Sequence, residues 1–158
     1  MTELHLTKNQ YLEVEKLSLG AFAPLSGFMN EEQFHSVVDD MRLPAGDPFP
    51  LPVVLDLAPD DASRIAGRPS VALVYEGEEI GALNPESQFT CDRTAAARKI
   101  FGTDDSNHPG VNYFCGGGGV FVGGAVSLTR RVQFEFSEEE RLPAETRALF
   151  ASRGWKRI

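Results

Sequence analysis

The sequence has little of what builds disulfide frameworks or metal sites. Its 158 residues include two cysteines, Cys91 and Cys115, with no CxxC spacing, and three histidines. Neither a disulfide framework nor a cysteine-based zinc site is therefore expected. We expect free thiols in a reducing compartment, and a disulfide between the two cysteines stays open.

Long apolar runs are also missing. No stretch approaches the length of a membrane span, and the N-terminus has no apolar core of the kind found in secretion signals. These absences predict a cytoplasmic protein without a membrane partner.

Basic residues are too few to balance the acidic ones. Fifteen Lys and Arg face 23 Asp and Glu, giving a net charge of −8. An acidic surface repels phosphate backbones, so nucleic acid is disfavoured as a partner. The basic clusters at 130–131 and 153–157 could form local patches, but we interpret them as solvated surface groups.

Length and composition predict one soluble domain over residues 1–158. Hydrophobic residues make up 42% of the chain, enough for a core, and the 15 Gly and 10 Pro favour turns and short strands. Strand and helix patterns do not alternate strictly, which argues against a doubly wound parallel sheet. The prediction is an α+β fold, a small mixed barrel or sheet with short peripheral helices.

Four helices are predicted, and the second has the clearest pattern. Asn30 is a good N-cap, Gln33 completes a capping box, and the spacing of Phe34 to Met41 indicates a buried stripe. The four predicted ranges are 10–19, 31–41, 93–101 and 143–153, with glycine stops at Gly20, Gly102 and Gly154.

Strands are predicted from short apolar or alternating runs. The two runs on either side of Glu76-Gly77-Glu78-Glu79 predict a hairpin. The N-terminal residues around His5 are expected to be frayed. The predicted strands are 53–57, 71–75, 80–83, 120–126 and 132–136.

The glycine cluster 116–119 admits two interpretations. Glycine-rich backbones can cradle phosphate, but no Lys-Ser or Lys-Thr pair follows, and a strand rather than a helix comes next. We therefore favour a flexible hairpin connection.

The polar loop 103–109 also has two interpretations. Asp105, Asn107 and His108 could bind a ligand or act as an acid and base, with Arg42 a further possible ligand contact. The alternative is a turn whose Asp and Asn side chains bond the local backbone. No metal spacing is present, and the residues predict no catalytic site.

Several segments resemble ATP sulfurylases (sulfate adenylyltransferases). The segment 20–30, GAFAPLSGFMN, resembles that family's GxFSPLxGFM motif, and VVDDMRL at 37–43 resembles its VVxxMRL stretch. FGTDDSNHPGV at 101–111 resembles a family loop, and PAETRALF with Gly154-Trp155-Lys156 resembles the entry to its catalytic domain. The glycine cluster and residues 82–90 depart from the family pattern.

The resemblance implies an N-terminal PUA-like domain, a mixed β pseudo-barrel, without the catalytic domain. Residues 154–158 would then start the segment that enters that domain. The family's Gln-Thr-Arg-Asn-Pro and His-x-x-His segments match no position here, so the resemblance supplies no catalytic residue, no metal ligand and no cofactor; Mg-ATP belongs to the catalytic domain. The matched residues are expected to be structural: Gly20, Phe22, Pro24, Leu25, Gly27, Phe28, Met29, Arg42, Leu43, Gly102, Thr103, His108, Pro109, Gly110, Gly154 and Trp155.

The resemblance implies a non-catalytic role in sulfate activation, and the chain alone is expected to be inactive. The expected partner is the catalytic domain or another copy of the chain. One alternative is a stand-alone module that binds a nucleotide or a sulfated metabolite. RNA binding is a third hypothesis, which the acidic charge opposes. Trp155 and Ile158 are expected to begin a strand that is buried elsewhere.

Overall fold

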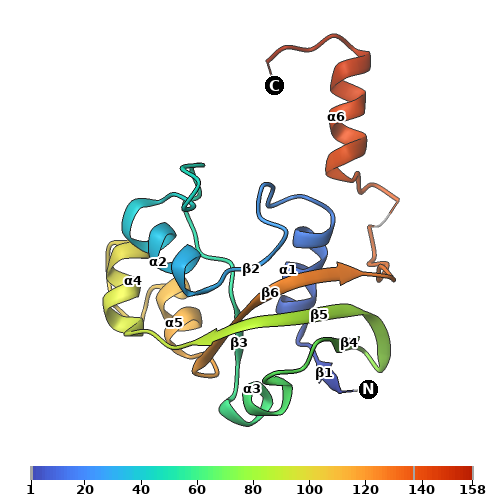
Figure 1. Ribbon diagram of the computed structural model, residues 1–158. Coiled ribbons are helices and arrows are strands. Elements are labelled where there is room, and N and C mark those ends of the chain that lie inside the picture. Colours follow the sequence, from blue (N-terminus) through green and yellow to red (C-terminus); the bar gives the residue numbers. More distant parts are fainter. Residues whose placement is uncertain (1, 137, 158) are drawn as a thin grey trace.

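The computed structural model describes residues 2–136 and 138–157 (Figure 1). Over these ranges the strands form one open mixed sheet in the order β1-β4-β5-β6-β2, with β3 also paired to β6. Strand β1 runs parallel to β4, and the other pairs are antiparallel. The α+β prediction is confirmed. The strands are β1 (Glu3–His5), β2 (Gly27–Phe28), β3 (Leu55–Leu57), β4 (Val71–Tyr75), β5 (Glu78–Phe89) and β6 (Val120–Leu128).

Strands β5 and β6 form the centre of the sheet and are longer than their apolar runs predict. Their register extends from Gly81 opposite Leu128 to Phe89 opposite Phe121, with an irregularity between Pro85 and Ser87. The predicted hairpin is confirmed, since β4 and β5 meet through a two-residue turn at Glu76 and Gly77, both with positive φ.

All of the helices but the last lie next to this sheet (Figure 1). They are α1 (Lys8–Ser18), α2 (Glu31–Asp40), α3 (Pro59–Ile65), α4 (Arg93–Phe101), α5 (Pro109–Cys115) and α6 (Pro143–Ser152). The capping box of α2 is confirmed: the Gln33 N–H donates to Asn30 Oδ1 (2.9 Å), and the Asn30 N–H donates to Gln33 Oε1 (3.1 Å). Met41 is not part of the buried stripe. It ends α2 in a left-handed conformation (φ 53°), which turns its side chain outward to 61% exposure.

Two expectations about elements are wrong, and two short helices were not predicted. His5 lies in a strand rather than a frayed end, because residues 3–5 pair with Ala72 to Val74 in β4. The helices α3 and α5 are each seven residues long, too short to show a periodic pattern. Residues 132–136 belong to no strand; the Val132 N–H bonds the Tyr11 hydroxyl instead (2.8 Å).

The core has two parts. The larger cluster packs α1 and α3 against the sheet and includes Tyr11, Val14, Ile65 and Leu73. The smaller is an aromatic cluster beneath α2 and α4, where the rings of Phe34, Phe89 and Phe121 have centroids 5.4–5.5 Å apart. This second cluster packs α2, α4 and α5 against β5 and β6.

Helix α6 stands apart from the rest of the molecule (Figure 1). It follows the predicted boundaries, but none of its ten residues, all of them described, is buried. The ring of Phe150 stacks on Trp155 with centroids 5.8 Å apart, and Trp155 remains 50% exposed. The apolar surface of α6 is therefore open to contact with another protein surface.

Candidate functional site

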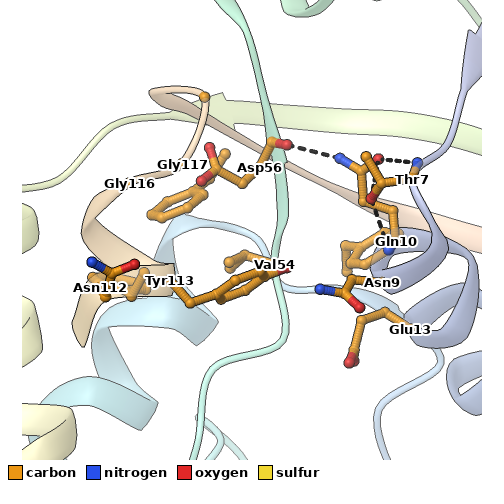
Figure 2. Close-up of a pocket in the computed structure, with 14 residues that line it drawn as sticks. Thr7, Asn9, Gln10, Glu13, Val54, Asp56, Asn112, Tyr113, Gly116 and Gly117 are labelled. Atoms are coloured by element: carbon orange, nitrogen blue, oxygen red, sulfur yellow. Dashed lines mark hydrogen bonds between the residues drawn. The ribbon is translucent and has the colours of Figure 1, made fainter. Parts of the chain in front are cut away.

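A groove of about 450 Å³ lies between α1, β3 and the end of α5 (Figure 2). A neighbouring hollow of about 310 Å³ shares Glu13, Val54, Tyr113 and Phe114 with it. The groove combines aromatic rings, side-chain amides and glycine backbone. Its lining residues are Thr7, Asn9, Gln10, Glu13, Phe28, Val54, Asp56, Asn112, Tyr113, Phe114, Gly116, Gly117, Gly118 and Phe121.

An ion pair beneath the groove fixes its wall. The Arg93 guanidinium on α4 donates to both oxygens of Asp56 on β3, at 2.7 and 2.8 Å. Both side chains are largely shielded, at 15% and 23% exposure, and the guanidinium lies 4.4 Å from the centroid of the Phe121 ring. Two parallel charge-assisted bonds hold both planar groups in one orientation.

The glycine cluster is packed tightly against this pair. The Gly119 N–H donates to Asp56 Oδ1 (3.0 Å), and a Cβ atom on Gly117 would lie 1.6 Å from Asp56 Oδ2. Only a residue without a side chain fits at Gly117. The segment connects α5 to β6, so the hairpin interpretation is wrong.

The other wall of the groove is α1, and Thr7 and Gln10 set its position. Thr7 caps this helix, with Gln10 completing a capping box. The Gln10 side-chain amide also donates to the Asp56 backbone oxygen (3.0 Å). Asp56 therefore links β3 to α1, α4 and the glycine segment.

The predicted ligand residues of the polar loop bond one another. Asp105 Oδ1 accepts from the backbone N–H and side-chain amide of Asn107, both at 2.9 Å, and Thr103 Oγ1 accepts from the Asp105 N–H (3.1 Å). His108 Nδ1 accepts from the Val111 N–H at the start of α5 (3.3 Å). This is the geometry of the turn interpretation.

Arg42 lies in a different loop. Its guanidinium donates to the Gly46 carbonyl (2.8 Å), and in the described ranges no hydrogen bond or ion pair connects it to residues 103–109. Ligand binding by Asp105, Asn107, His108 and Arg42 stays a prediction.

The residues of the family-like motifs are spread over the fold. Leu25, Phe28, Met29 and Leu43 are buried in the larger core cluster. A separate hollow of about 440 Å³ is lined by Pro24, Leu25, Gly27, Phe28 and Leu43, among others. Gly20 and Phe22 precede β2, and Gly154 and Trp155 follow α6. Gly102 caps α4, and Thr103 lies in the polar loop after it. Helix α5 begins with His108 as its cap, followed by Pro109 and Gly110.

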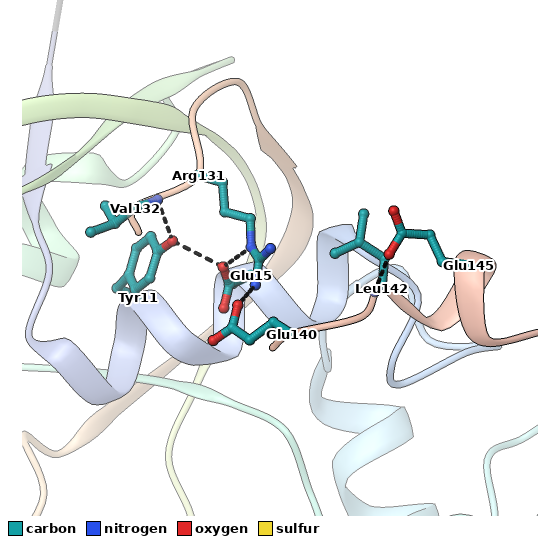
Figure 3. Close-up of polar contacts among 7 residues, drawn as sticks. All are labelled: Tyr11, Glu15, Arg131, Val132, Glu140, Leu142 and Glu145. Carbon is teal, nitrogen blue, oxygen red and sulfur yellow. Dashed lines mark hydrogen bonds and ion pairs between the residues drawn. The ribbon is translucent and has the colours of Figure 1, made fainter. Parts of the chain in front are cut away.

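A polar network holds the chain after β6 against α1 (Figure 3). Arg131 donates to Glu15 (2.7 Å) and to Glu140, and Glu15 accepts from the Tyr11 hydroxyl (3.1 Å). Burial has the largest effect on the pKa of Tyr11 and raises it, as does the nearby Glu15. The hydrogen bond from the Val132 N–H to the Tyr11 oxygen lowers this pKa. The network fixes where the chain leaves the domain.

The two cysteines are free thiols. Burial raises the pKa of Cys91, although the charge of Arg93 opposes this. Protonated thiols are poor nucleophiles and poor metal ligands. Within residues 2–136 and 138–157, no three His, Cys, Asp or Glu side chains gather closely enough to hold a metal ion.

Sequence reasoning missed Asp56, Arg93, Asn9 and Tyr113. One signal for Asp56 was present: a carboxylate between Leu55 and Leu57 is uncommon in a short strand and needs a partner. Arg93 follows the helix cap Asp92, and nothing local predicts that it reaches β3.

The fold and its elements define the class of protein. The chain belongs to the family of PUA-like domains, whose model matches residues 1–131. None of the helices in the described ranges is both long and apolar enough to cross a membrane.

Similar proteins point to one enzyme group. The chain is 33% identical over 153 residues to a sulfate adenylyltransferase of Deinococcus radiodurans, covering 97% of this chain and 39% of that protein. It is 35% identical over 163 residues to the sulfate adenylyltransferase of Schizosaccharomyces pombe, covering 100% of this chain and 33% of that protein. The chain thus spans less than half the length of these relatives.

A solved structure shares the fold. The hexameric APS kinase from Thiobacillus denitrificans matches with a TM-score of 0.71 and 26% identity, covering all of this chain and 27% of that one. The chain is therefore related to proteins of sulfate activation.

Proposed function

We propose that this chain is the N-terminal PUA-like domain of a sulfate adenylyltransferase and that its role there is structural. Such an enzyme joins ATP and sulfate to give adenylyl sulfate and pyrophosphate. The similarity covers nearly all of this chain but only 33–40% of these relatives, which supports a domain-sized match.

Helix α6 is the observation that carries the proposal. A ten-residue helix with no buried residue, followed by a half-exposed Trp155 that stacks on Phe150, is a poor match for an isolated domain. It is well suited to pack against a catalytic domain. In this proposal residues 154–158 begin the segment that enters that domain, although Ile158 lies outside the described residues.

The chemistry is assigned to the catalytic domain. Adenylyl transfer between two anions depends on clustered Arg, His and Mg²⁺ around the phosphates. Arg93 beneath the groove and Arg131 beside α1 are already paired with carboxylates. We therefore place Mg-ATP outside this chain and assign it contacts with the catalytic domain or with another copy of the chain.

A chimera tests the proposal. This chain replaces the matching segment of the Deinococcus radiodurans enzyme, and sulfate-dependent pyrophosphate release is measured. We expect the chimera to be active and this chain alone to be inactive. A chimera carrying both Phe150→Ala and Trp155→Ala should lose activity or assembly, whereas Phe136→Ala, an exposed aromatic outside α6, should have no effect.

Two results would refute the proposal. Sulfate-dependent pyrophosphate release by this chain alone would overturn the non-catalytic role. A folded chimera without activity would overturn the assignment of the domain.

A further inference from the structure

The charges around the groove are already balanced. Its two carboxylates are those of Glu13, which pairs with Lys16 (3.1 Å), and Asp56, which pairs with Arg93. Among the described lining residues none is a lysine or arginine. A charged ligand would find no free counter-charge there, which favours a neutral one.

Free hydrogen-bonding groups line the groove on two sides. The side-chain amides of Asn9 on α1 and Asn112 on α5 have no hydrogen-bond partner among the residues that the structure describes. The same holds for the backbone N–H groups of Gly117 and Gly118. An amide side chain offers both a donor and an acceptor, so together these groups match a ligand edge that carries both kinds.

Aromatic rings supply flat apolar surface in the same place. Tyr113 is 66% exposed and lies beside Val54 between the two asparagines (Figure 2). The partly exposed Phe114 adds apolar surface, whereas Phe28 and Phe121 are buried, at 3% and 1% exposure. An exposed aromatic side chain is a stacking surface for a planar ring. The volume, about 450 Å³, lies in the range of small-molecule sites.

We propose that this groove binds a neutral planar heterocycle, of which a purine base is the best match. The base stacks on Tyr113, and its edge bonds to Asn9, Asn112 and the Gly117-Gly118 backbone. A base could come from a free nucleoside or from single-stranded RNA. The net charge of −8 favours the free nucleoside. The site is independent of the structural role proposed above.

Nuclear magnetic resonance on the ¹⁵N-labelled chain tests this site, with adenosine and guanosine as probes. We expect saturable shifts of the Asn9 and Asn112 side-chain amides and of the Gly117 and Gly118 N–H groups. AMP should bind no more tightly than adenosine, because no cation lines the groove. No shift at millimolar nucleoside, or shifts confined to residues 103–109, would overturn the proposal.

Variants separate stacking from a general effect on the fold. Tyr113→Ala should weaken adenosine binding about tenfold, as expected for loss of one stacking contact. Tyr113→Phe should retain affinity, since the ring remains. Phe136→Ala, another exposed aromatic, is the matched control and should bind normally. Equal affinity in Tyr113→Ala and the control would contradict the stacking.

An oligoadenylate distinguishes the two sources of the base. Binding comparable to that of adenosine, and insensitive to salt, is expected for a nucleoside site. Binding that is far tighter and falls steeply with salt would overturn the free-nucleoside assignment.

Discussion

Asp56 and Arg93 form a two-point ion pair across 37 residues of sequence, with nitrogen–oxygen distances of 2.7 and 2.8 Å. The pair joins β3 to α4 beneath the groove. It also positions the glycine segment, because Asp56 accepts from Gly119. One contact therefore determines both the packing of α4 and the shape of the groove.

Arg93→Ala is expected to destabilise the domain. The Asp56 carboxylate would stay largely shielded without its counter-charge, which costs about 2–3 kcal/mol of unfolding free energy, less than for a fully buried pair. Urea denaturation followed by circular dichroism measures this. Arg98→Ala, which breaks the exposed Arg98–Asp104 pair on the same helix, should leave the unfolding midpoint unchanged. Equal losses in both variants would contradict the importance of the Asp56 pair.

Gly27→Ala should be more damaging than Gly20→Ala. A Cβ atom on Gly27 would lie 2.3 Å from the Gly124 oxygen in the β2–β6 pair, whereas Gly20 has nothing within 4 Å. Overpacking of this kind costs about 1–3 kcal/mol. Gly20→Ala carries only the strain of a left-handed residue (φ 74°), about 1 kcal/mol. Thermal unfolding of both variants compares them, and the reverse order would refute the close approach of β2 to β6.

Stability should fall above about pH 10 partly through Tyr11, whose ordinary pKa is 10.0. Burial raises the pKa of Tyr11 in the folded state, so the unfolded chain loses this proton first as the pH rises. The contribution of Tyr11 to the free energy of unfolding is complete below pH 10. It is lost as the pH rises through the pKa of Tyr11 in the folded state. In Tyr11→Phe the decline between pH 9 and 11 should be shallower in urea unfolding. Burial also raises the pKa of Tyr75, so part of the decline should remain; an unchanged slope would exclude a contribution from Tyr11.

Arg131→Ala should loosen the segment after β6. Glu15, whose side chain is 11% exposed, would lose its guanidinium partner, at a cost of about 2 kcal/mol. Hydrogen exchange should then accelerate at the Val132 N–H. The neighbouring Arg130→Ala breaks only an exposed pair with Glu78 and should not change exchange at Val132. Unchanged exchange in Arg131→Ala would show that the Tyr11 hydroxyl holds the Val132 N–H without help from the Arg131–Glu15 pair.

Removal of residues 142–158 should leave the unfolding free energy within about 0.5 kcal/mol of that of the whole chain. The reason is that α6 buries no side chain. Urea denaturation followed at 222 nm measures this. A loss of more than about 1.5 kcal/mol would show that α6 packs on the domain in solution.

Local sequence patterns predicted the helices whose ends are marked by capping residues. The caps Asn30 and Asp92 and the stop Gly102 occupy their predicted positions, because capping is decided within a few residues. Strand β1 could not be predicted, since three residues have no period and gain their partner 69 positions away: Glu3 pairs with Ala72. Residues 132–136 have a strand pattern, but the Tyr11 hydroxyl takes the Val132 N–H.

The groove could not be predicted from the sequence. Asn9, Asp56 and Tyr113 belong to three different elements, and only the tertiary fold brings them to one cavity. The polar loop 103–109 suggested ligand binding because it contains Asp and His side chains. In the structure, Asp105 and His108 instead accept hydrogen bonds from residues two and three positions along the chain. The chemical reactivity of a residue type is thus a weaker indication of a binding site than several side chains meeting in one cavity.

The isolation of α6 has a consequence for how its sequence varies. Residues packed in the sheet can change only together with their neighbours in this domain, whereas no residue of α6 is buried in it and Phe150 stacks on Trp155 of the same segment. Substitutions in α6 should therefore covary with residues of the surface that it meets, and hardly at all with β5 or β6. Such covariation across related proteins would identify the surface that α6 contacts without a structure of the complex.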